Sequence, residues 1–184
     1  LVVYSYTPLW LARVLMALVW LLFVPADFAR QKSQALNEFL LHLFKPFMRE
    51  YEADGLAGTT FLLTGSALVV FVCPREVTML ALLFLAFADP FASYFGIRYG
   101  KDKIFGHKSV QGTIAAFLIC TLAMVLFMYA HNLLLDRLVM VGLLGGLIGA
   151  LAELIPVGRL DDNLTLPVFS ATFLWLLFSL FGAI

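Results

Sequence analysis

The densest group of polar residues in the sequence runs from Asp89 to Thr113, between two apolar segments. Asp89 interrupts an apolar run beside Pro90, and an ionisable group at such a depth is costly unless it is paired or hydrated. A carboxylate followed by small residues and several ammonium groups is what a metal-bound polyphosphate requires. Basic residues beside a helix-end acid are equally typical of an ordinary loop between membrane helices. The residues of this group expected to contact such a polyphosphate are Gly96, Gly100, Lys101, Lys103, His107, Lys108, Ser109, Gly112 and Thr113.

A second polar group, from Glu153 to Pro167, has the chemistry of a magnesium site. Glu153 lies inside an apolar segment, and three oxygen-bearing residues stand at the start of the next one. Carboxylates are the ligands that Mg²⁺ prefers, whereas a helix N-cap needs only one such residue. We therefore expect a metal site here and place Asn163 beside the nucleotide. The expected metal ligands are Asp89, Glu153, Asp161 and Asp162.

A third group, from Met48 to Thr60, carries charges ahead of a glycine-containing turn. Arg49 is expected to neutralise phosphate charge and Glu52 to orient it. Hydroxyls and free amides at the following helix start would also suit an anion. Charged residues flanking an apolar segment are common, so this group is the weakest of the three.

These residues must be positioned by membrane helices. The chain has 184 residues, of which 62% are hydrophobic and 13% charged, whereas a soluble domain usually has about 25% charged residues. A span needs about 20 apolar residues. The sequence predicts a single integral membrane domain over residues 1–184, an all-α polytopic helical bundle with about six transmembrane helices. The expected spans are Leu9–Val24, Leu56–Val72, Val77–Phe95, Thr113–Ala130, Leu138–Ile155 and Leu164–Ile184, with one interfacial amphipathic helix over Ala35–Met48.

The distribution of charge predicts the orientation of the chain. Nine Lys and Arg residues fall in the loops that join one set of span ends, against two on the other side, and the richer side is cytoplasmic. The candidate site loops, at about 45–60, 89–113 and 153–167, all share that face. Since 12 Lys and Arg match 12 Asp and Glu without a basic run, nucleic-acid binding is disfavoured. The P-loop, H-E-x-x-H and G-x-S-x-G motifs do not occur.

With these clusters in view, the sequence resembles the CTP-dependent membrane lipid kinases, which include dolichol or polyprenol kinase, phytol kinase and CTP-dependent diacylglycerol kinase. The family pattern D-x-x-A-x-x-x-G-x-x-x-G, followed by a basic spacer and K-[KT/S]-x-E-G-x-x-A, is similar to Asp89, Ala92, Gly96, Gly100, Lys108, Ser109, Gly112 and Ala115 here. The run from Asp161 to Pro167 is similar to D-N-L-T-[VL]-P. Arg49 and Glu52, with Gly58 and Leu62-Leu63, are similar to R-x-x-E…G-x-x-x-L-L.

The resemblance covers residues 30–170 and includes departures from the family pattern. Gln111 stands where the family often has Glu, and His107 replaces a frequent Lys. The basic, His-containing element that usually opens these proteins is missing, as expected for a truncated or divergent amino end.

The resemblance implies a CTP-dependent lipid kinase that transfers a phosphoryl group to the hydroxyl of a membrane lipid alcohol, namely polyprenol or dolichol, phytol or diacylglycerol. CTP would be the co-substrate and Mg²⁺ the cofactor. One alternative is a cytidylyltransferase acting on a lipid phosphate, like the CDP-diacylglycerol synthases, whose glycine-rich C-terminal signature is not seen. A second is a small membrane transporter or scaffold without enzymatic activity.

The expected roles follow from charge. Lys108, with Lys101 or Lys103, would hold phosphate oxygens. Asp89 would complete the metal site or accept the hydroxyl proton, two roles that the sequence does not separate. The protein is expected in the inner or plasma membrane with its site at the cytoplasmic face, in contact with the bilayer and in a homo-oligomer.

Overall fold

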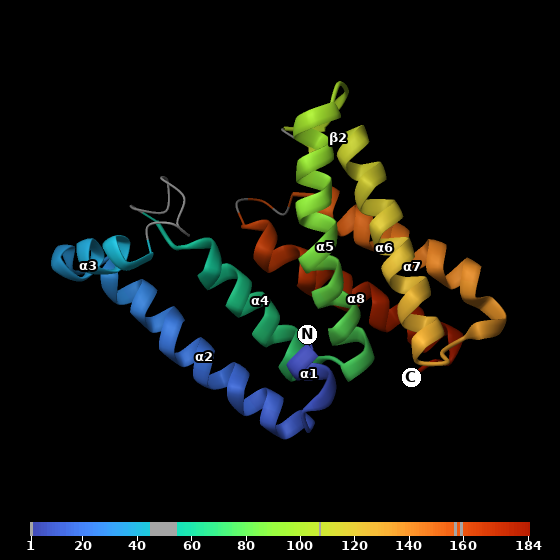
Figure 1. Cartoon of the computed structure of the whole chain (residues 1–184), viewed down its shortest axis with the longest axis horizontal. Helices are drawn as coiled ribbons and strands as arrows, with labels where there is room; N and C mark the ends of the chain where they lie inside the picture. Colours follow the sequence, from blue (N-terminus) through green and yellow to red (C-terminus); the bar gives the residue numbers. More distant parts are fainter. Residues whose placement is uncertain (1, 45–54, 107, 157, 159) are drawn as a thin grey trace.

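The structure, a computed structural model, describes residues 2–44, 55–106, 108–156, 158 and 160–184. Helices account for most of them, which confirms the prediction of an all-α polytopic bundle (Figure 1). The elements in chain order are α1 (Val2–Tyr6), α2 (Leu9–Arg30), α3 (Gln34–Phe44), α4 (Gly58–Val72), α5 (Arg75–Tyr99), β1 (Lys103–Phe105), β2 (Lys108–Ser109), α6 (Val110–Ala130), the 3-10 turn η3 (Leu135–Arg137), α7 (Leu138–Leu154) and α8 (Asp162–Phe181).

Five helical stretches in this described part have the length and hydropathy to cross a membrane, namely α2, α5, α6, the continuous η3 and α7, and α8. The sixth expected span forms α4, which has only 15 residues. At 1.5 Å per residue it is about 22 Å long, less than the ~30 Å hydrocarbon core of a bilayer. α2 in turn is longer than expected and continues through Pro25 to Arg30. The expected interfacial helix is observed as α3, and its last expected residues, 45–48, lie outside the described part.

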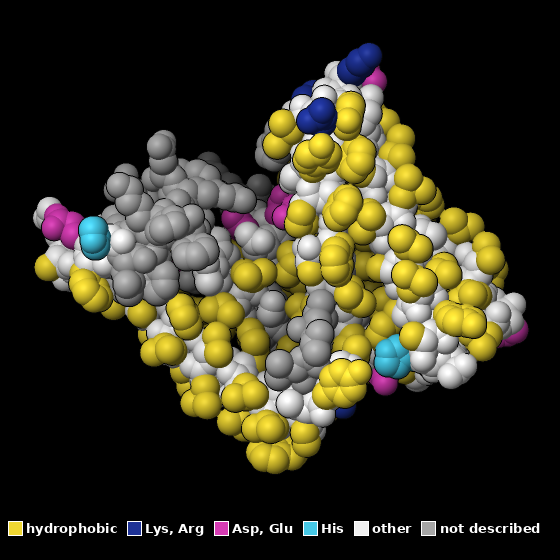
Figure 2. Space-filling view, in the orientation of Figure 1, with side chains coloured by type: hydrophobic (Ala, Val, Ile, Leu, Met, Phe, Trp, Pro, Cys, Tyr) yellow, Lys and Arg dark blue, Asp and Glu magenta, His cyan; other side chains and the backbone are white. Residues whose placement is uncertain are grey.

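The surface of the bundle is apolar, as a lipid environment requires. Leu22, Leu118, Val139 and Leu180 are all more than half exposed. Figure 2 shows hydrophobic side chains covering the helices, with basic side chains gathered at the tip of α5 and its hairpin. Lipid tails are as apolar as these side chains, so association of the helices depends on close packing rather than on escape from water.

α5, α6, α7 and α8 enclose the main core. Leu80 and Phe84 of α5, Met124 and Met128 of α6 and Phe178 of α8 are completely buried there. α2 lies at the edge of the bundle, beside α4 (Figure 1). Arg13 of α2 donates to the Val70 carbonyl oxygen at 3.3 Å, which links α2 to the end of α4.

Glycines bring the core helices close together. Four glycines of α7, at 142, 145, 146 and 149, face α6, and a Cβ on Gly146 would lie 1.9 Å from Thr121 Oγ1. The run therefore packs in the small-xxx-small manner. The backbones of α5 and α6 are in direct contact at Gly112. A Cβ added to this glycine would lie 2.7 Å from the Ala92 carbonyl oxygen.

One end of the bundle is polar. The first turns of α4, α6 and α8 meet the last turns of α5 and α7 at this end. β1 and β2 form a small antiparallel hairpin between α5 and α6, with Gly106 at its turn in the left-handed region at φ +53°. Figure 2 shows acidic side chains at the notch between α4 and the upper half of α5.

Gly112→Ala should destabilise the protein by about 2 kcal/mol, because overpacking against a fixed backbone carbonyl cannot be relieved by a side-chain movement. Gly145→Ala is the comparison and should cost less. Its new Cβ would lie 2.8 Å from Met124 Cγ, a side-chain atom that can shift, whereas both variants gain the same helix propensity of about 1 kcal/mol. Thermal unfolding in detergent measures both, and equal losses for the two variants would contradict this account of the α5–α6 contact.

Candidate functional site

A polar cleft of about 530 Å³ opens at the polar end of the bundle. Its lining combines residues far apart in the sequence, from α5, the hairpin, α6, the end of α7 and the start of α8. Eleven of the residues expected in the site line it: Asp89, Gly96, Lys103, Lys108, Ser109, Gly112, Thr113, Glu153, Asp161, Asp162 and Asn163. Residues of the first two sequence clusters, together with Leu56 of the third, therefore line one cavity.

Lys108 is the centre of this cleft. Its Nζ donates to Glu153 Oε1 and to Asp162 Oδ2, each at 2.7 Å. The Lys108 side chain is 12% exposed and that of Glu153 only 3%, whereas that of Asp162 is 40% exposed. An ammonium group has three N–H donors, so these two bonds leave one for a ligand in the cleft. Lys108 thus joins the hairpin to α7 and α8.

The two carboxylates keep Lys108 charged. Burial by itself lowers the pKa of Lys108, but the hydrogen bonds and negative charges of Asp162 and Glu153 outweigh burial and raise this pKa above its ordinary value. The Lys108 ammonium is therefore a fixed positive charge at physiological pH.

Among the described residues that line the cleft, carboxylates outnumber ammonium groups. Four carboxylates, those of Asp89, Glu153, Asp161 and Asp162, line it together with two ammonium groups, those of Lys103 and Lys108. The charges of Asp89 and Asp162 both act on Glu153. A polyphosphate entering such a cleft needs additional positive charge beside it.

The start of α6 contributes its cap and its dipole to the cleft. Ser109 is buried and caps this helix, because its Oγ accepts from the Gly112 N–H at 3.2 Å. Thr113 Oγ1 donates to the Ser109 carbonyl oxygen at 3.1 Å. Gly96 packs against this turn, where an added Cβ would lie 3.2 Å from Ser109 Oγ. The Val110 N–H donates to the Asp102 carbonyl oxygen at 3.0 Å, so this turn offers the cleft the positive end of the helix dipole.

The two acids at the start of α8, Asp161 and Asp162, have different partners. Asp161 is the N-cap, since its Oδ1 accepts from the Asn163 N–H at 2.9 Å. Asp162 binds Lys108. The expectation that one cap explains only one of these residues is therefore confirmed.

Other expected residues lie apart from the cleft lining. Gly100 contributes to helix packing, where an added Cβ would lie 2.1 Å from the Gly96 carbonyl oxygen. The Lys101 side chain is exposed, and its backbone N–H donates to Gln111 Oε1 at 3.2 Å. Gln111 Nε2 in turn reaches Asp102 Oδ2 at 3.4 Å, so this glutamine fastens the loop ahead of the hairpin. Three expected residues, Arg49, Glu52 and His107, lie outside the described residues.

A buried ion pair beside the cleft was missed by the sequence analysis. Arg30 Nε donates to Asp27 Oδ1 at 2.5 Å, and Arg30 also donates to Asn37 Oδ1 and to the Gly55 carbonyl oxygen. Asp27 Oδ2 accepts from the Ala57 N–H and from Thr60 Oγ1. This network fixes the start of α4, whose Leu56 and Phe61 neighbours line the cleft. The sequence signal that could have revealed this pair is an acid and a base three residues apart, Asp27 and Arg30, which follow Pro25 at the end of an apolar helix.

The donor set fits Mg²⁺ rather than a metal that needs a complete protein cage. Across the described part of the chain, no three Asp, Glu, His or Cys side chains form a group ready to hold a metal ion. Mg²⁺ keeps several waters and commonly uses one or two carboxylates together with substrate phosphates. The acids of the cleft supply such carboxylates.

Comparison with known proteins gives three related sequences. CTP-dependent diacylglycerol kinase 1 of Schizosaccharomyces pombe is 33% identical over 168 residues, which cover 84% of this chain and 77% of that protein. The chain belongs to the CTP-dependent lipid kinase family. The prediction of a phosphotransferase with an alcohol acceptor is confirmed at this level.

The other two relatives are longer. CTP-dependent diacylglycerol kinase 1 of Eremothecium gossypii and that of Saccharomyces cerevisiae are 29% and 28% identical, each over 80% of this chain. The chain spans 53% and 58% of these two relatives, respectively. No family model and no solved structure matches the chain.

Lys108→Ala should lower the stability of the ligand-free protein by about 3 kcal/mol, because it leaves the buried Glu153 carboxylate without its partner. Combining it with Glu153→Gln should recover part of the loss, since a neutral amide is cheaper to bury. Lys101→Ala, which removes an exposed ammonium group from the same loop, is the control. If Lys108→Ala had the same unfolding temperature as the wild type, the ion pair would not stabilise the fold.

The pH dependence of that loss has a defined sign. Because the folded-state pKa of Lys108 lies above the unfolded one, the stabilisation is complete below the unfolded pKa and is lost as pH rises through the folded-state pKa. The stability difference between wild type and the double variant Lys108→Ala/Glu153→Gln, in which no unpaired Glu153 titrates, should therefore stay constant from about pH 7 to 9, well below the usual lysine pKa of about 10.4. A difference that shrinks within that range, in thermal unfolding across buffers, would contradict the raised pKa.

Proposed function

We propose that this protein transfers the terminal phosphoryl group of CTP to the hydroxyl of diacylglycerol. The observation that supports this most directly is the cleft itself, in which Lys108 is held between two carboxylates beside the start of a helix. The relatives named CTP-dependent diacylglycerol kinase 1 supply the nucleotide and the lipid of the proposal.

In this proposal the phosphates lie against the start of α6. Lys108 donates its remaining N–H to a phosphate oxygen, and Lys103 at the cleft wall adds a second positive charge. The positive end of the α6 dipole would favour the same oxygens. Because Glu153 and Asp162 fix the Lys108 ammonium in advance, binding costs little reorganisation at this point. Arg49 and Glu52 keep their expected roles as a neutralising charge and its orienting partner.

Mg²⁺ would be held by Asp162 and Asp161, with Asp89 and the buried Glu153 as the other acids of the lining. The ion would supply the charge neutralisation that lets a polyphosphate approach an acidic cavity. The excess of carboxylates over ammonium groups in the lining supports this requirement. The protein's own part is to orient the phosphates and to exclude water from the side closed by Leu56 and Phe61.

Asp89 is assigned as the proton acceptor. The lipid oxygen forms a bond to the terminal phosphorus, the bond from that phosphorus to the bridging oxygen of CDP breaks, and the hydroxyl proton passes to the Asp89 carboxylate. CDP leaves with the bridging oxygen. Asp89 lies in α5, lines the cleft and is close enough to Glu153 for its charge to act there, which supports this role. The cleft would face the cytoplasm, as the excess of basic residues at this end of the bundle favours.

The assay that tests the function uses purified protein in detergent with diacylglycerol and two labelled forms of CTP. Label on the terminal phosphate should appear in the lipid, whereas label on the α-phosphate should not. Transfer of the α-label would instead indicate a cytidylyltransferase. Absence of transfer from either position, with a full-length relative active in parallel, would refute the proposed function.

Asp89→Asn should lower kcat by a factor of about 10² to 10⁴, the usual contribution of a general base. CTP should still stabilise this variant against heat in the presence of Mg²⁺, because the phosphates are held by other groups. Asp136→Asn, at an exposed acid in η3, is the control and should leave both measurements unchanged. Loss of nucleotide stabilisation in the Asp89 variant would assign this residue to the metal instead.

A further inference from the structure

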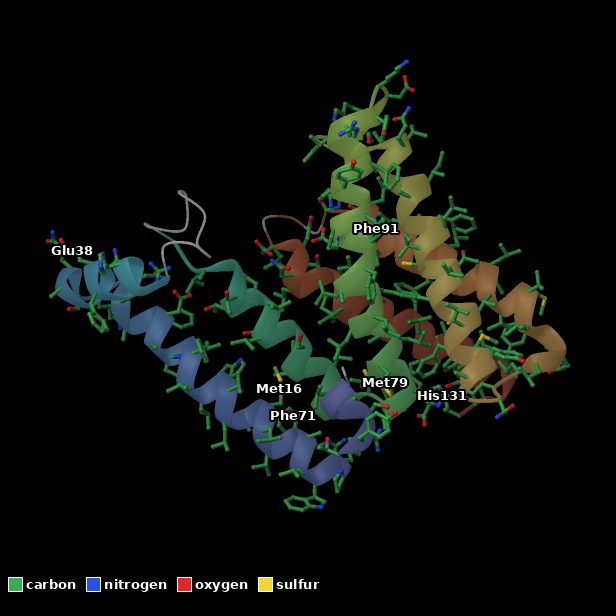
Figure 3. All side chains as sticks on the ribbon, viewed as in Figure 1. Met16, Glu38, Phe71, Met79, Phe91 and His131 are labelled. Atoms are coloured by element: carbon green, nitrogen blue, oxygen red, sulfur yellow. The ribbon has the colours of Figure 1, made fainter. Side chains whose placement is uncertain are left out.

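A second cavity, largely apolar, opens next to the polar cleft. It has a volume of about 680 Å³ and lies between α2, α4 and α5. Leu15 and Val19 of α2, Leu62 and Leu63 of α4, and Leu85 and Ala86 of α5 are among its lining residues. Met16 also lines it, and Figure 3 shows this side chain on the face of α2 that is turned toward α4.

Two residues belong to both cavities. Asp89 and Asn163 line the polar cleft and also the apolar groove between α2, α4 and α5. The groove therefore ends at the carboxylate to which the proposed function assigns the hydroxyl proton. An apolar chain in the groove with a polar group at this end would present that group to the cleft.

We propose that this groove holds an acyl chain of the lipid acceptor and delivers its hydroxyl to Asp89. The proposal rests on the proposed function, because it assumes that the alcohol reacts in the polar cleft. The groove supplies apolar contact along the chain, and Asn163 offers an amide to the polar end of the lipid. Asp89 then stands where the two substrates meet.

The position and shape of the groove favour a lipid as its occupant. Leu15 and Val19 are about two-fifths exposed, so the groove opens on the apolar outer surface of the bundle. The stretch from Leu62 to Val70 on α4 gives it a length of about 12 Å. Tyr4, Ala12 and Val70 pack together at the end remote from Asp89. A helix from a second copy would fill the same apolar surface but would bring no alcohol to Asp89.

A neighbouring groove provides a comparison within the same helix pair. A cavity of about 360 Å³ lies on the other side of the α2–α4 contact and is lined by Ala17, Trp20, Ala67 and Phe71, among others. Within the described residues, this second groove shares no lining residue with the polar cleft. A chain bound there would have no route to Asp89.

The test compares two Ala→Phe variants by steady-state kinetics. Ala86→Phe narrows the groove that reaches Asp89 and should raise KM for long-chain diacylglycerol about tenfold or more, the scale of a steric change in an apolar pocket. KM for CTP should not change. Ala67→Phe narrows the other groove and should leave KM for the lipid at the wild-type value. A wild-type KM for Ala86→Phe, or equal increases in both variants, would overturn the proposal.

Photo-crosslinking gives a readout that does not depend on turnover. A diacylglycerol with a diazirine in one acyl chain, bound to the purified protein, should label peptides from residues 62–70 and 82–90, and Ala86→Phe should abolish this labelling. Labelling confined to other segments, or to a subunit contact, would overturn the groove assignment even if the enzyme is active. Labelling of the groove without phosphoryl transfer would instead refute the proposed function and retain the groove as a lipid site.

Discussion

The arrangement of the cleft depends on one buried ammonium group. Lys108 contacts a carboxylate at the end of α7 and another at the start of α8, and it reaches both from the short hairpin before α6. A buried ammonium group destabilises the fold unless carboxylates neutralise it, and the buried Glu153 carboxylate likewise needs the ammonium group. Three segments are thereby held at one place. The interaction that positions the site is also the one that gives the site its electrostatic character.

Much of this arrangement was accessible from the sequence. Composition and the length of apolar runs determine that the chain is a membrane bundle, and loop charges indicate which helix ends gather the polar residues. Asp89, Lys108 and Glu153 stand out because an ionisable residue in or beside an apolar span needs a partner. The pairing of Lys108 with Glu153 and Asp162 was not accessible, because spacing along a chain does not tell which of several nearby acids a lysine will reach.

The roles of the glycines could not be predicted from the sequence, for a different reason. A glycine near a phosphate-binding loop and a glycine that allows two helices to touch look the same in a sequence. In the structure, Gly112 lets α5 and α6 approach to backbone contact, and Gly100 packs against the preceding turn. The pair of Asp27 and Arg30 was overlooked for a related reason. Both residues lie beyond Val24, the last residue of the expected span, whereas α2 continues to Arg30 and buries them.

The shortness of α4 has a consequence for where the reaction takes place. Its 15 residues leave the start of the helix below the level that a full span would reach. The Asp27–Arg30 network occupies the depth that one more turn would have filled. In the proposed function, the start of α4 and the cleft beside it would lie closer to the lipid tails than they would with a full-length span. A lipid acceptor could then reach the site by lateral diffusion, without the work of extracting an acyl chain into water, and the water-soluble nucleotide would enter from the polar end of the bundle.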